Sequence, residues 1–407
     1  MFDVAIIGAG AAGMMAASVA GQRGLRVVLI DHATKLAEKI RISGGGRCNF
    51  TNLGTTPANF ISANPNFCRS ALSAYRPQDF LALLKEYRIA WHEKHKGQLF
   101  CDESAEDLIQ MLRSECDKGQ VSWRMPCTVQ TVRAQADHYV IETEQVGTLT
   151  ARQLVVATGG MAIPAIGATD FALKLARQFG LKVIEPRPAL VPLNFDAQAW
   201  QALKVLSGVS LPVRIAAANQ GKRRIEFDED LLFTHRGLSG PAILQISSYW
   251  DSGQPLHVDL APALDLSSAL LEAKQGGRQQ VNTMLQEWLP KRLVEQWGDA
   301  QPDQAWSNVL AQRLADAPDK QLRALAQNLQ HWAITPTGTA GYKKAEVMRG
   351  GVDTCELSQK SFEARKQPGL YFIGEAVDVT GWLGGYNFQW AWASGWSVGH
   401  ALSSQNK

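Results

Sequence analysis

Three glycines near the N-terminus, Gly8, Gly10 and Gly13, are spaced as in turns that bind the pyrophosphate of a dinucleotide. In such a turn the first glycine permits a sharp bend, the second lets the backbone approach phosphate, and the third lets a helix pack against a strand. The free amides at the start of that helix then face the phosphate. An apolar run precedes the turn, and Asp31 follows a second apolar run, where its carboxylate suits a ribose diol and disfavours the 2′-phosphate of NADP. A dinucleotide site is therefore predicted, against the alternative of a plain glycine-rich turn.

A second glycine-rich region, close to the C-terminus, indicates which dinucleotide is bound. Residues 369–375 read as a strand that ends in Gly374 and Glu375, and residues 384–387, Gly-Gly-Tyr-Asn, open a helix. Between them, the Asp378 carboxylate can hold ribityl hydroxyls, and the helix N-terminus can stabilise negative charge on a reduced flavin. A simple NAD dehydrogenase needs no such element, so FAD is predicted. The alternative is a terminal helix that only packs, with its tryptophans in the core: Trp390, Trp392 and Trp396.

A third run, from Ser43 to Asn52, has three consecutive glycines followed by hydrogen-bonding side chains. Glycines permit close backbone approach, which suits a loop around the ribityl and phosphate side of a flavin; a flexible surface loop is the alternative. A further glycine turn follows the buried strand that begins at residue 155. The predicted cofactor-binding residues are Gly8, Gly10, Ala12, Gly13, Asp31, Lys39, Gly45, Gly46, Arg47, Cys48, Asn49, Thr158, Gly159, Gly374, Glu375, Asp378, Gly385, Tyr386 and Asn387.

The elements around these motifs begin in βαβ order, because residues 3–7 and 26–30 read as buried strands with a helix at 14–23 between them. Helical periodicity dominates residues 57–120, and a meander of short strands follows at 121–154. This order predicts an α/β, Rossmann-type domain.

The middle of the chain has a different texture. Proline-punctuated apolar segments predict a small β unit with strands at 190–195, 209–216, 224–227, 242–247 and 256–260. A region rich in Leu, Ala, Gln and Trp then predicts a helical unit. The predicted domains are a discontinuous FAD-binding domain at 1–190 and 333–407, an inserted β unit at 191–262 and an inserted helical unit at 263–332.

Composition limits the other function classes. The 407 residues are 45% hydrophobic and 19% charged with a net charge of +3, which is typical of a globular protein and predicts no strong nucleic-acid or membrane field. The six cysteines form no C-x-x-C pair, so neither a metal site nor a dithiol couple is predicted, and a reducing cytoplasm fits. Residues 4–21 carry no charge, but Asp3 stands where a signal peptide has basic residues, so no membrane segment is expected.

With these motifs in place, the chain resembles the BaiN/YhiN-like NAD(P)/FAD-dependent oxidoreductases, also described as aminoacetone-oxidase-like flavoproteins. The resemblance runs end to end and rests on the first glycine turn and on residues 43–52, 232–241, 350–352 and 374–387. It implies a glutathione-reductase-like FAD domain interrupted by a β-barrel-like unit and a small helical unit. Thr380, Leu383 and the Met348-Arg349 pair depart from the pattern of the main branch, which indicates a side branch.

The resemblance implies one of three chemistries: reduction of conjugated C=C bonds in steroid-like substrates, oxidation of amines, or reduction of uridine to dihydrouridine in large-subunit ribosomal RNA. We expect hydride transfer from reduced FAD to an electron-poor C=C bond, with a side chain protonating the neighbouring carbon. Cys48, His235 and Tyr386 are the candidate acids, although Cys48 and His235 also suit structural roles. No second G-x-G-x-x-G motif occurs, so NAD(P)H is expected to bind transiently.

An RNA substrate requires basic surface near the flavin, and the chain has short basic clusters at 94–96, 222–224, 291–292 and 343–344. Such clusters are also common on surfaces that bind no RNA, and scattered positions would favour a small enone. No feature predicts a DNA partner, and the oligomeric state stays open. An amine oxidase and a non-catalytic FAD-binding protein are the alternative functions.

Overall fold

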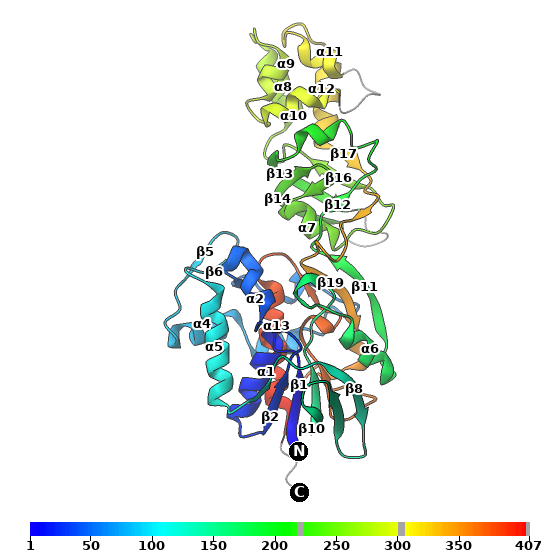
Figure 1. Ribbon diagram of the computed structural model, residues 1–407. Coiled ribbons are helices and arrows are strands. Elements are labelled where there is room, and N and C mark those ends of the chain that lie inside the picture. Colours follow the sequence, from blue (N-terminus) through cyan, green and yellow to red (C-terminus); the bar gives the residue numbers. More distant parts are fainter. Residues whose placement is uncertain (218–223, 300–305, 404–407) are drawn as a thin grey trace. The chain divides into compact units, whose positions relative to one another are not determined.

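The computed structural model describes residues 1–217, 224–299 and 306–403, and it divides into two compact units (Figure 1). The first unit combines Met1–Arg187 with Glu346–Lys407, and the second unit is Pro188–Ala345. The glycine motifs at the two ends of the chain therefore lie in the same unit. The Rossmann-type α/β fold predicted from the sequence is confirmed.

A parallel sheet forms the centre of the first unit. Its strands β1 (Phe2–Ile7), β2 (Val27–Ile30) and β20 (Leu370–Phe372) are mostly apolar and buried, as expected for a sheet covered on both faces. Residues 4–7 of the first strand, for example, are at most 5% exposed. In spatial order the parallel strands are β7 (Ser122–Arg124), β2, β1, β10 (Gly147–Val156) and β20.

Strand β10 has a second role. Its first half pairs antiparallel with β9 (Tyr139–Thr143), which pairs with β8 (Val129–Ala134), and its second half pairs parallel with β1. The predicted meander is therefore present, and it delivers Thr158 and Gly159 to the carboxyl edge of the sheet.

Two helices from opposite ends of the chain pack against each other beside this sheet. They are α1 (Ala11–Gln22) and α13 (Tyr386–Ala401), and both lack side-chain volume where they approach. A Cβ atom on Gly399 of α13 would lie 2.6 Å from Cβ of Val19. This close packing fixes the start of α13 relative to the glycine turn before α1.

The remaining elements of the first unit form small sheets and surface helices around this centre. They are α2 (Glu38–Ile42), β3 (Asn49–Asn52), β4 (Phe60–Ile61), α3 (Arg69–Ala74), α4 (Pro77–Glu86), β5 (Trp91–Glu93), β6 (Gln98–Cys101), α5 (Ala105–Lys118), α6 (Phe171–Gln178), β11 (Val183–Ala189), β19 (Val347–Val352) and β21 (Thr380–Gly381). Strand β6 pairs with β3 on one side and with β5 on the other, so β5 is an edge strand.

The second unit contains an antiparallel sheet and a group of helices. The strands are β12 (Leu193–Asn194), β13 (Ser210–Ala217), β14 (Ile225–Thr234), β15 (Gly237–Ser239), β16 (Leu256–Asp259), β17 (Trp332–Ile334) and β18 (Gly338–Thr339). The helices are α7 (Pro241–Ser247), α8 (Leu266–Lys274), α9 (Val281–Leu285), α10 (Lys291–Trp297), α11 (Trp306–Ala311) and α12 (Asp319–Gln330). Helices thus occupy the described parts of the region 263–332, as the sequence predicted. The separation of this region from the β unit as a domain stays a prediction.

Two sequence predictions are wrong here. Residues 242–247 are the helix α7 and not a strand, because Pro241 starts a helical turn after Gly240 and a short buried apolar run has no distinguishing period. Residues 333–345 belong to the second unit and not to the FAD-binding domain, because β17 pairs with β16 and β18 pairs with β12.

None of the described helices is long and apolar enough to cross a membrane. Within the described residues, no group of three or more His, Cys, Asp or Glu side chains is placed to hold a metal ion.

Candidate active site

The three glycines of the N-terminal turn have different surroundings. Gly8 has φ +107°, and a Cβ atom there would lie 2.5 Å from the carbonyl oxygen of Ala157. A Cβ atom on Gly13 would overlap the carbonyl oxygen of Gly8, whereas one on Gly10 would have no described protein atom within 4 Å. Gly8 and Gly13 therefore permit close packing of strand and helix, and Gly10 faces open space at the start of α1. This is the arrangement expected for phosphate approach.

Asp31 lies at the end of β2, beside that turn. Its Oδ2 accepts a hydrogen bond from the backbone N–H of Ala9 at 2.6 Å, and its Oδ1 accepts one from Ala33 at 2.8 Å. These bonds fix the carboxylate next to the turn. Each oxygen keeps a further lone pair for a ribose hydroxyl.

The loop before β3 has a run of left-handed backbone. Gly44, Gly45 and Gly46 have φ of +56°, +69° and +88°, which favours glycine at each position. Cβ atoms on Gly45 and Gly46 would meet no described atom within 4 Å, so their backbone is open to a ligand. Arg47, which follows them, is exposed.

Cys48 ends this loop and points into the core. Its side chain is buried, its φ is +46°, and its backbone N–H donates to the Ser43 carbonyl at 3.1 Å. Burial raises the pKa of the Cys48 thiol far above its ordinary range. A thiol with no exposed surface favours a packing role over proton donation to a substrate.

Two buried side-chain oxygens at the predicted cofactor site have no hydrogen-bond partner within the described chain. They are Asn49 Oδ1 and Thr158 Oγ1. Buried polar atoms normally have hydrogen-bond partners. These two atoms lie in segments that also contain glycines whose backbone is open to a ligand. A bound polar ligand would therefore supply the missing hydrogen bonds. Together with the space at Gly10, Gly45 and Gly159, they fit FAD.

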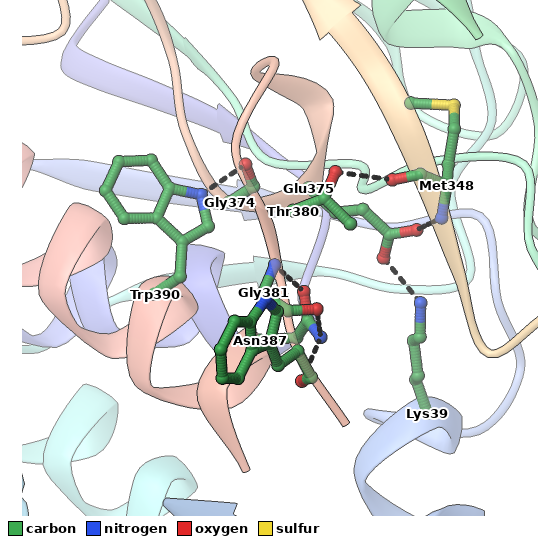
Figure 2. Close-up of polar contacts among 9 residues, drawn as sticks. Lys39, Met348, Gly374, Glu375, Thr380, Gly381, Asn387 and Trp390 are labelled. Atoms are coloured by element: carbon green, nitrogen blue, oxygen red, sulfur yellow. Dashed lines mark hydrogen bonds and ion pairs between the residues drawn. The ribbon is translucent and has the colours of Figure 1, made fainter. Parts of the chain in front are cut away.

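Glu375 connects the N-terminal and C-terminal parts of the site (Figure 2). Its Oε2 accepts from Lys39 Nζ at 2.5 Å, and its Oε1 accepts from the backbone N–H of Met348 at 2.8 Å. The Thr380 hydroxyl donates to the Met348 carbonyl at 3.2 Å. The predicted cofactor residues Lys39 and Glu375 thus pair with each other, and Thr380 has a structural role on β21.

Two of the three tryptophans of α13 lie in the core, and Trp396 is partly buried. Trp390 Nε1 donates to the Gly374 carbonyl at 2.9 Å, and Trp392 Nε1 donates to the Phe50 carbonyl at 2.8 Å (Figure 2 shows the first bond). Both side chains are at most 1% exposed. These bonds anchor Gly374 and β3 to α13, so a packing role for these two tryptophans is compatible with a cofactor role for the start of the helix.

That start is formed by Gly385, Tyr386 and Asn387. The Asn387 amide accepts from Gly381 N at 2.8 Å and donates to Gly381 O at 2.9 Å, so it holds the loop before the helix. Tyr386 is 9% exposed, and its ring lies edge-on to Phe60 and Trp382. The side chain of Asn387 therefore acts on the cofactor site through the backbone of its own loop.

Asp378 is 3% exposed, and its Oδ2 accepts from the backbone N–H of Ala63 at 2.8 Å. Burial raises the pKa of this carboxyl.

The sequence did not predict two buried amides that support the site. Asn52 Nδ2 donates to the carbonyls of Lys96 and Gly384 at 3.1 and 2.9 Å. Gln389, which is fully buried, accepts from Thr51 Oγ1 at 2.6 Å and donates to the Tyr75 carbonyl at 2.9 Å. The one sequence feature that could have indicated a role for Gln389 is its position between two aromatic residues in an apolar helix.

His235, the remaining candidate acid, lies in the second unit. Its Nδ1 is 3.1 Å from Ser207 Oγ, and its side chain is exposed. The basic clusters are divided among the parts of the chain: 94–96 lies in the first unit, 291–292 and 343–344 in the second, and residues 222 and 223 fall outside the described residues. Arg224 forms an ion pair with Glu226 at 2.7 Å.

Comparison with known proteins gives matches along the whole chain. A family model described as "HI0933-like protein Rossmann domain" matches residues 2–401. Two relatives named "Ribosomal RNA dihydrouridine synthase" are 47% identical (Escherichia coli strain K12) and 45% identical (Haemophilus influenzae strain Rd), each with 98% of both chains covered. A "3-dehydro-bile acid delta(4,6)-reductase" from Clostridium scindens is 28% identical over all of both chains.

Two solved structures match the chain at lower identity. A 3-ketosteroid-Δ4-(5α)-dehydrogenase from Rhodococcus jostii RHA1 is 15% identical with a TM-score of 0.47, and the match covers 99% of this chain and 97% of that one. A flavocytochrome c3 fumarate reductase is also 15% identical, with a TM-score of 0.45 and coverage of 99% and 79%.

Proposed function

Because the chain belongs to the HI0933-like Rossmann-domain family, we propose that it reduces uridine to dihydrouridine in ribosomal RNA. It is an FAD-dependent oxidoreductase. The observation that carries the proposal is the end-to-end identity of 47% and 45% to two relatives that are named for this reaction. The division of the basic clusters between the two units favours a small enone, but the relative named for reduction of a bile acid is 28% identical, so a small enone is the weaker candidate.

The names of these relatives describe one type of chemistry on different substrates. Uridine and a 3-dehydro-Δ4,6 steroid both have a C=C bond conjugated to a carbonyl. When bound, FAD supplies hydride transfer from NAD(P)H to the far carbon of such a bond. The near carbon must then receive a proton, and this proton has to come from a side chain or from water.

The residues of the first unit divide the binding of FAD among them. We assign the pyrophosphate to the turn at Gly8–Gly13 and the adenosine ribose to Asp31. The loop of Gly45 to Asn49, together with Thr158 and Gly159, holds the flavin side, where the Asn49 amide oxygen can accept and the Thr158 hydroxyl can donate or accept. The ion pair of Lys39 and Glu375 keeps the N-terminal and C-terminal walls of this site together.

Tyr386 is the proton donor in this proposal. It is the first residue of α13, beside the segment expected to face the flavin, and a phenol carries its proton at neutral pH. The buried thiol of Cys48 is left with a packing role. His235 lies in the second unit, and this proposal gives it no part in proton transfer.

NAD(P)H is the electron donor in this proposal and binds transiently, because one glycine turn is occupied by FAD and the sequence has no second one. An rRNA substrate also places the enzyme in the cytoplasm.

The decisive test is deletion of the gene, followed by mass spectrometry of ribosomal RNA. We expect one dihydrouridine of large-subunit rRNA to disappear and to return with a plasmid copy of the wild-type gene, but not with the Gly10→Ala variant. Purified enzyme with NADPH or NADH should form the same product on rRNA from the deletion strain. Unchanged rRNA would exclude this substrate. Oxygen consumption with aminoacetone, measured at an oxygen electrode, would instead support an amine oxidase.

A further inference from the structure

We propose that one surface of the first unit binds a single-stranded segment of RNA and leads it to the flavin site; this inference rests on the proposed function. The surface is made by the C-terminal half of α4 and by the β5–β6 hairpin. We call it the hairpin surface and define it by Lys85, Arg88, Trp91, His92 and Lys94 (α4, β5 and β6 are labelled in Figure 1).

An exposed tryptophan is at its centre. Trp91 is 39% exposed, and all three residues of the edge strand β5 are exposed. Most other tryptophans of the first unit are buried or packed against the core. An exposed indole is a platform on which an unpaired base can stack, because every base has a π face.

A groove of about 420 Å³ lies beside this indole. Leu81 and Ile89 contribute apolar surface to it, and Lys85 and Arg88 line it as well. No acidic residue lines this groove. An apolar floor with cations and an aromatic wall matches a nucleotide, which has a flat base and an anionic phosphate.

The cations of the groove are not used within the protein. In the described part of the chain, neither Lys85 nor Arg88 forms an ion pair, whereas Lys118, Arg133 and Lys174 pair with carboxylates. Farther along the hairpin, Lys94 Nζ lies 5.6 Å from the centre of the Phe100 ring, and His92 stacks on the same ring. His92 Nδ1 lies 2.6 Å from Asp102 Oδ1, and Glu93 is exposed on the same strand. The cations that can meet phosphate are therefore Lys85, Arg88 and Lys94.

The hairpin is tied to the segment that enters α13. Asn52 Nδ2 donates both to the Lys96 carbonyl in the hairpin turn and to the Gly384 carbonyl. A Cβ atom on Gly384 would lie 2.8 Å from Nε2 of Gln98 at the start of β6, so the Gln98 side chain packs against the Gly384 backbone. RNA that runs from Trp91 along β5 toward the hairpin turn therefore arrives beside Gly385 and Tyr386, where the proposed chemistry takes place.

Binding of single-stranded RNA by the FAD-loaded enzyme tests this surface directly. The probe is a fluorescein-labelled RNA of roughly 15 nucleotides, read by fluorescence anisotropy. Trp91→Ala should weaken binding roughly tenfold, and Trp91→Phe should restore most of it because a ring remains. The double variant Lys85→Gln, Arg88→Gln should weaken binding and reduce the salt slope by about 1.4, the value for two lost phosphate contacts.

The matched control is Lys174→Gln with Arg177→Gln on α6, on the opposite side of the first unit (Figure 1). It removes the same two charges from exposed positions, so it should bind the probe within about twofold of wild type. The flavin absorption spectrum and the thermal midpoint show whether each variant is folded.

Dihydrouridine in rRNA of the complemented deletion strain separates the two proposals. If the wild-type gene restores no dihydrouridine, the proposed function fails. If it does, but the hairpin variants bind the probe and restore dihydrouridine as well as the α6 control, the hairpin surface is wrong and the function stands. If polyglutamate displaces the probe equally from wild type and Trp91→Ala, the surface binds acidic peptides and the RNA assignment is overturned.

Discussion

The N-terminal glycines differ in what an added methyl group would meet, and this difference separates cofactor binding from folding. Alanine at position 10 fits the protein itself, because its φ of −83° is ordinary and the space around it is open. We expect Gly10→Ala to lose FAD while the free energy of unfolding of the apoprotein stays unchanged or rises by about 0.5 kcal/mol. The flavin absorbance of the purified protein and urea unfolding of the apoprotein measure the two effects.

Gly13→Ala is the control for this prediction. Its methyl group would overlap the Gly8 carbonyl, so the helix must move away from the strand. We expect a loss of roughly 2–4 kcal/mol of stability in the apoprotein as well. Retention of FAD by Gly10→Ala would mean that the phosphate does not lie at this turn.

Cys48 and Tyr386 can be separated by their effects on catalysis. Tyr386→Phe removes the phenolic hydroxyl and keeps the ring packing against Phe60, so we expect product formation to fall by roughly 100- to 10,000-fold with FAD still bound. Cys48→Ala removes a buried sulfur, and the rate should stay within about threefold of wild type, with about 1 kcal/mol lost in stability. Single-turnover oxidation of the NADPH-reduced enzyme by rRNA gives these rates. The reverse pattern would identify the thiol as the acid.

Buried thiols make stability depend on pH in the alkaline range. Burial raises the pKa of the Cys68 thiol to about 11, compared with about 8.5 in an unfolded chain. Above pH 8.5 the unfolded chain loses this proton and the folded protein keeps it, so stability is complete below pH 8.5 and falls as the pH rises toward 11.

The expected loss from Cys68 is about 1.4 kcal/mol for each pH unit in that range. Urea unfolding at pH 8, 9 and 10 should therefore show a smaller decline in Cys68→Ala than in wild type. The comparison is needed because burial also raises the pKa of other thiols, Cys101 among them. Parallel declines in the two proteins would show that Cys68 is ionised or exposed in the folded state.

Among the elements, the β5–β6 hairpin depends on one amide for its connection to α13. Asn52→Asp keeps the size of the side chain and the acceptor for the Gly54 N–H, but it turns a donor to two carbonyls into an oxygen that repels them. We expect a loss of roughly 1–3 kcal/mol in stability. Hydrogen exchange should become faster at residues 94–98 and 384–386.

Asn387→Asp serves for comparison, because Asn387 binds the loop before α13 and makes no bond to the hairpin. Its effect on exchange should be limited to residues 381–387. Equal exchange in the hairpin for wild type and Asn52→Asp would mean that other contacts hold the two segments together.

The elements differ in how well local sequence predicts them. The βαβ opening was predictable, because apolar runs and a glycine turn leave few alternatives for residues 3–30. The helix at 241–247 was not, because seven residues are too few to show a period and its burial comes from the second unit's sheet. Strand β17 was placed in the wrong unit because its partner, β16, is distant in the sequence.

For the molecule as a whole, the two strands that connect the units allow the second unit to be removed and the first to be tested alone. The chain leaves the first unit through β11 and returns through β19, and these two strands pair with each other (Figure 1). All predicted FAD-binding residues lie in the first unit. Replacing residues 191–343 by a short glycine-rich linker should therefore give a folded, yellow protein.

This shortened protein should retain FAD absorbance but form dihydrouridine at least roughly 100-fold more slowly, because it lacks every substrate contact that the second unit would supply. Thermal unfolding with and without FAD checks that the first unit folds. A colourless but folded product would place part of the FAD site in residues 191–343.

The sequence by itself determined the Rossmann-type fold and FAD, because the spacing of glycines reflects local backbone geometry that few other structures need. It also indicated a family, through motifs distributed over the chain. Only the tertiary structure decided what each side chain does: Asn387 holds a loop, Glu375 pairs with Lys39, Cys48 is buried, and Asn52 joins a hairpin to α13. These roles depend on partners up to hundreds of residues away, and the chain encodes such contacts only through the packing of the complete fold.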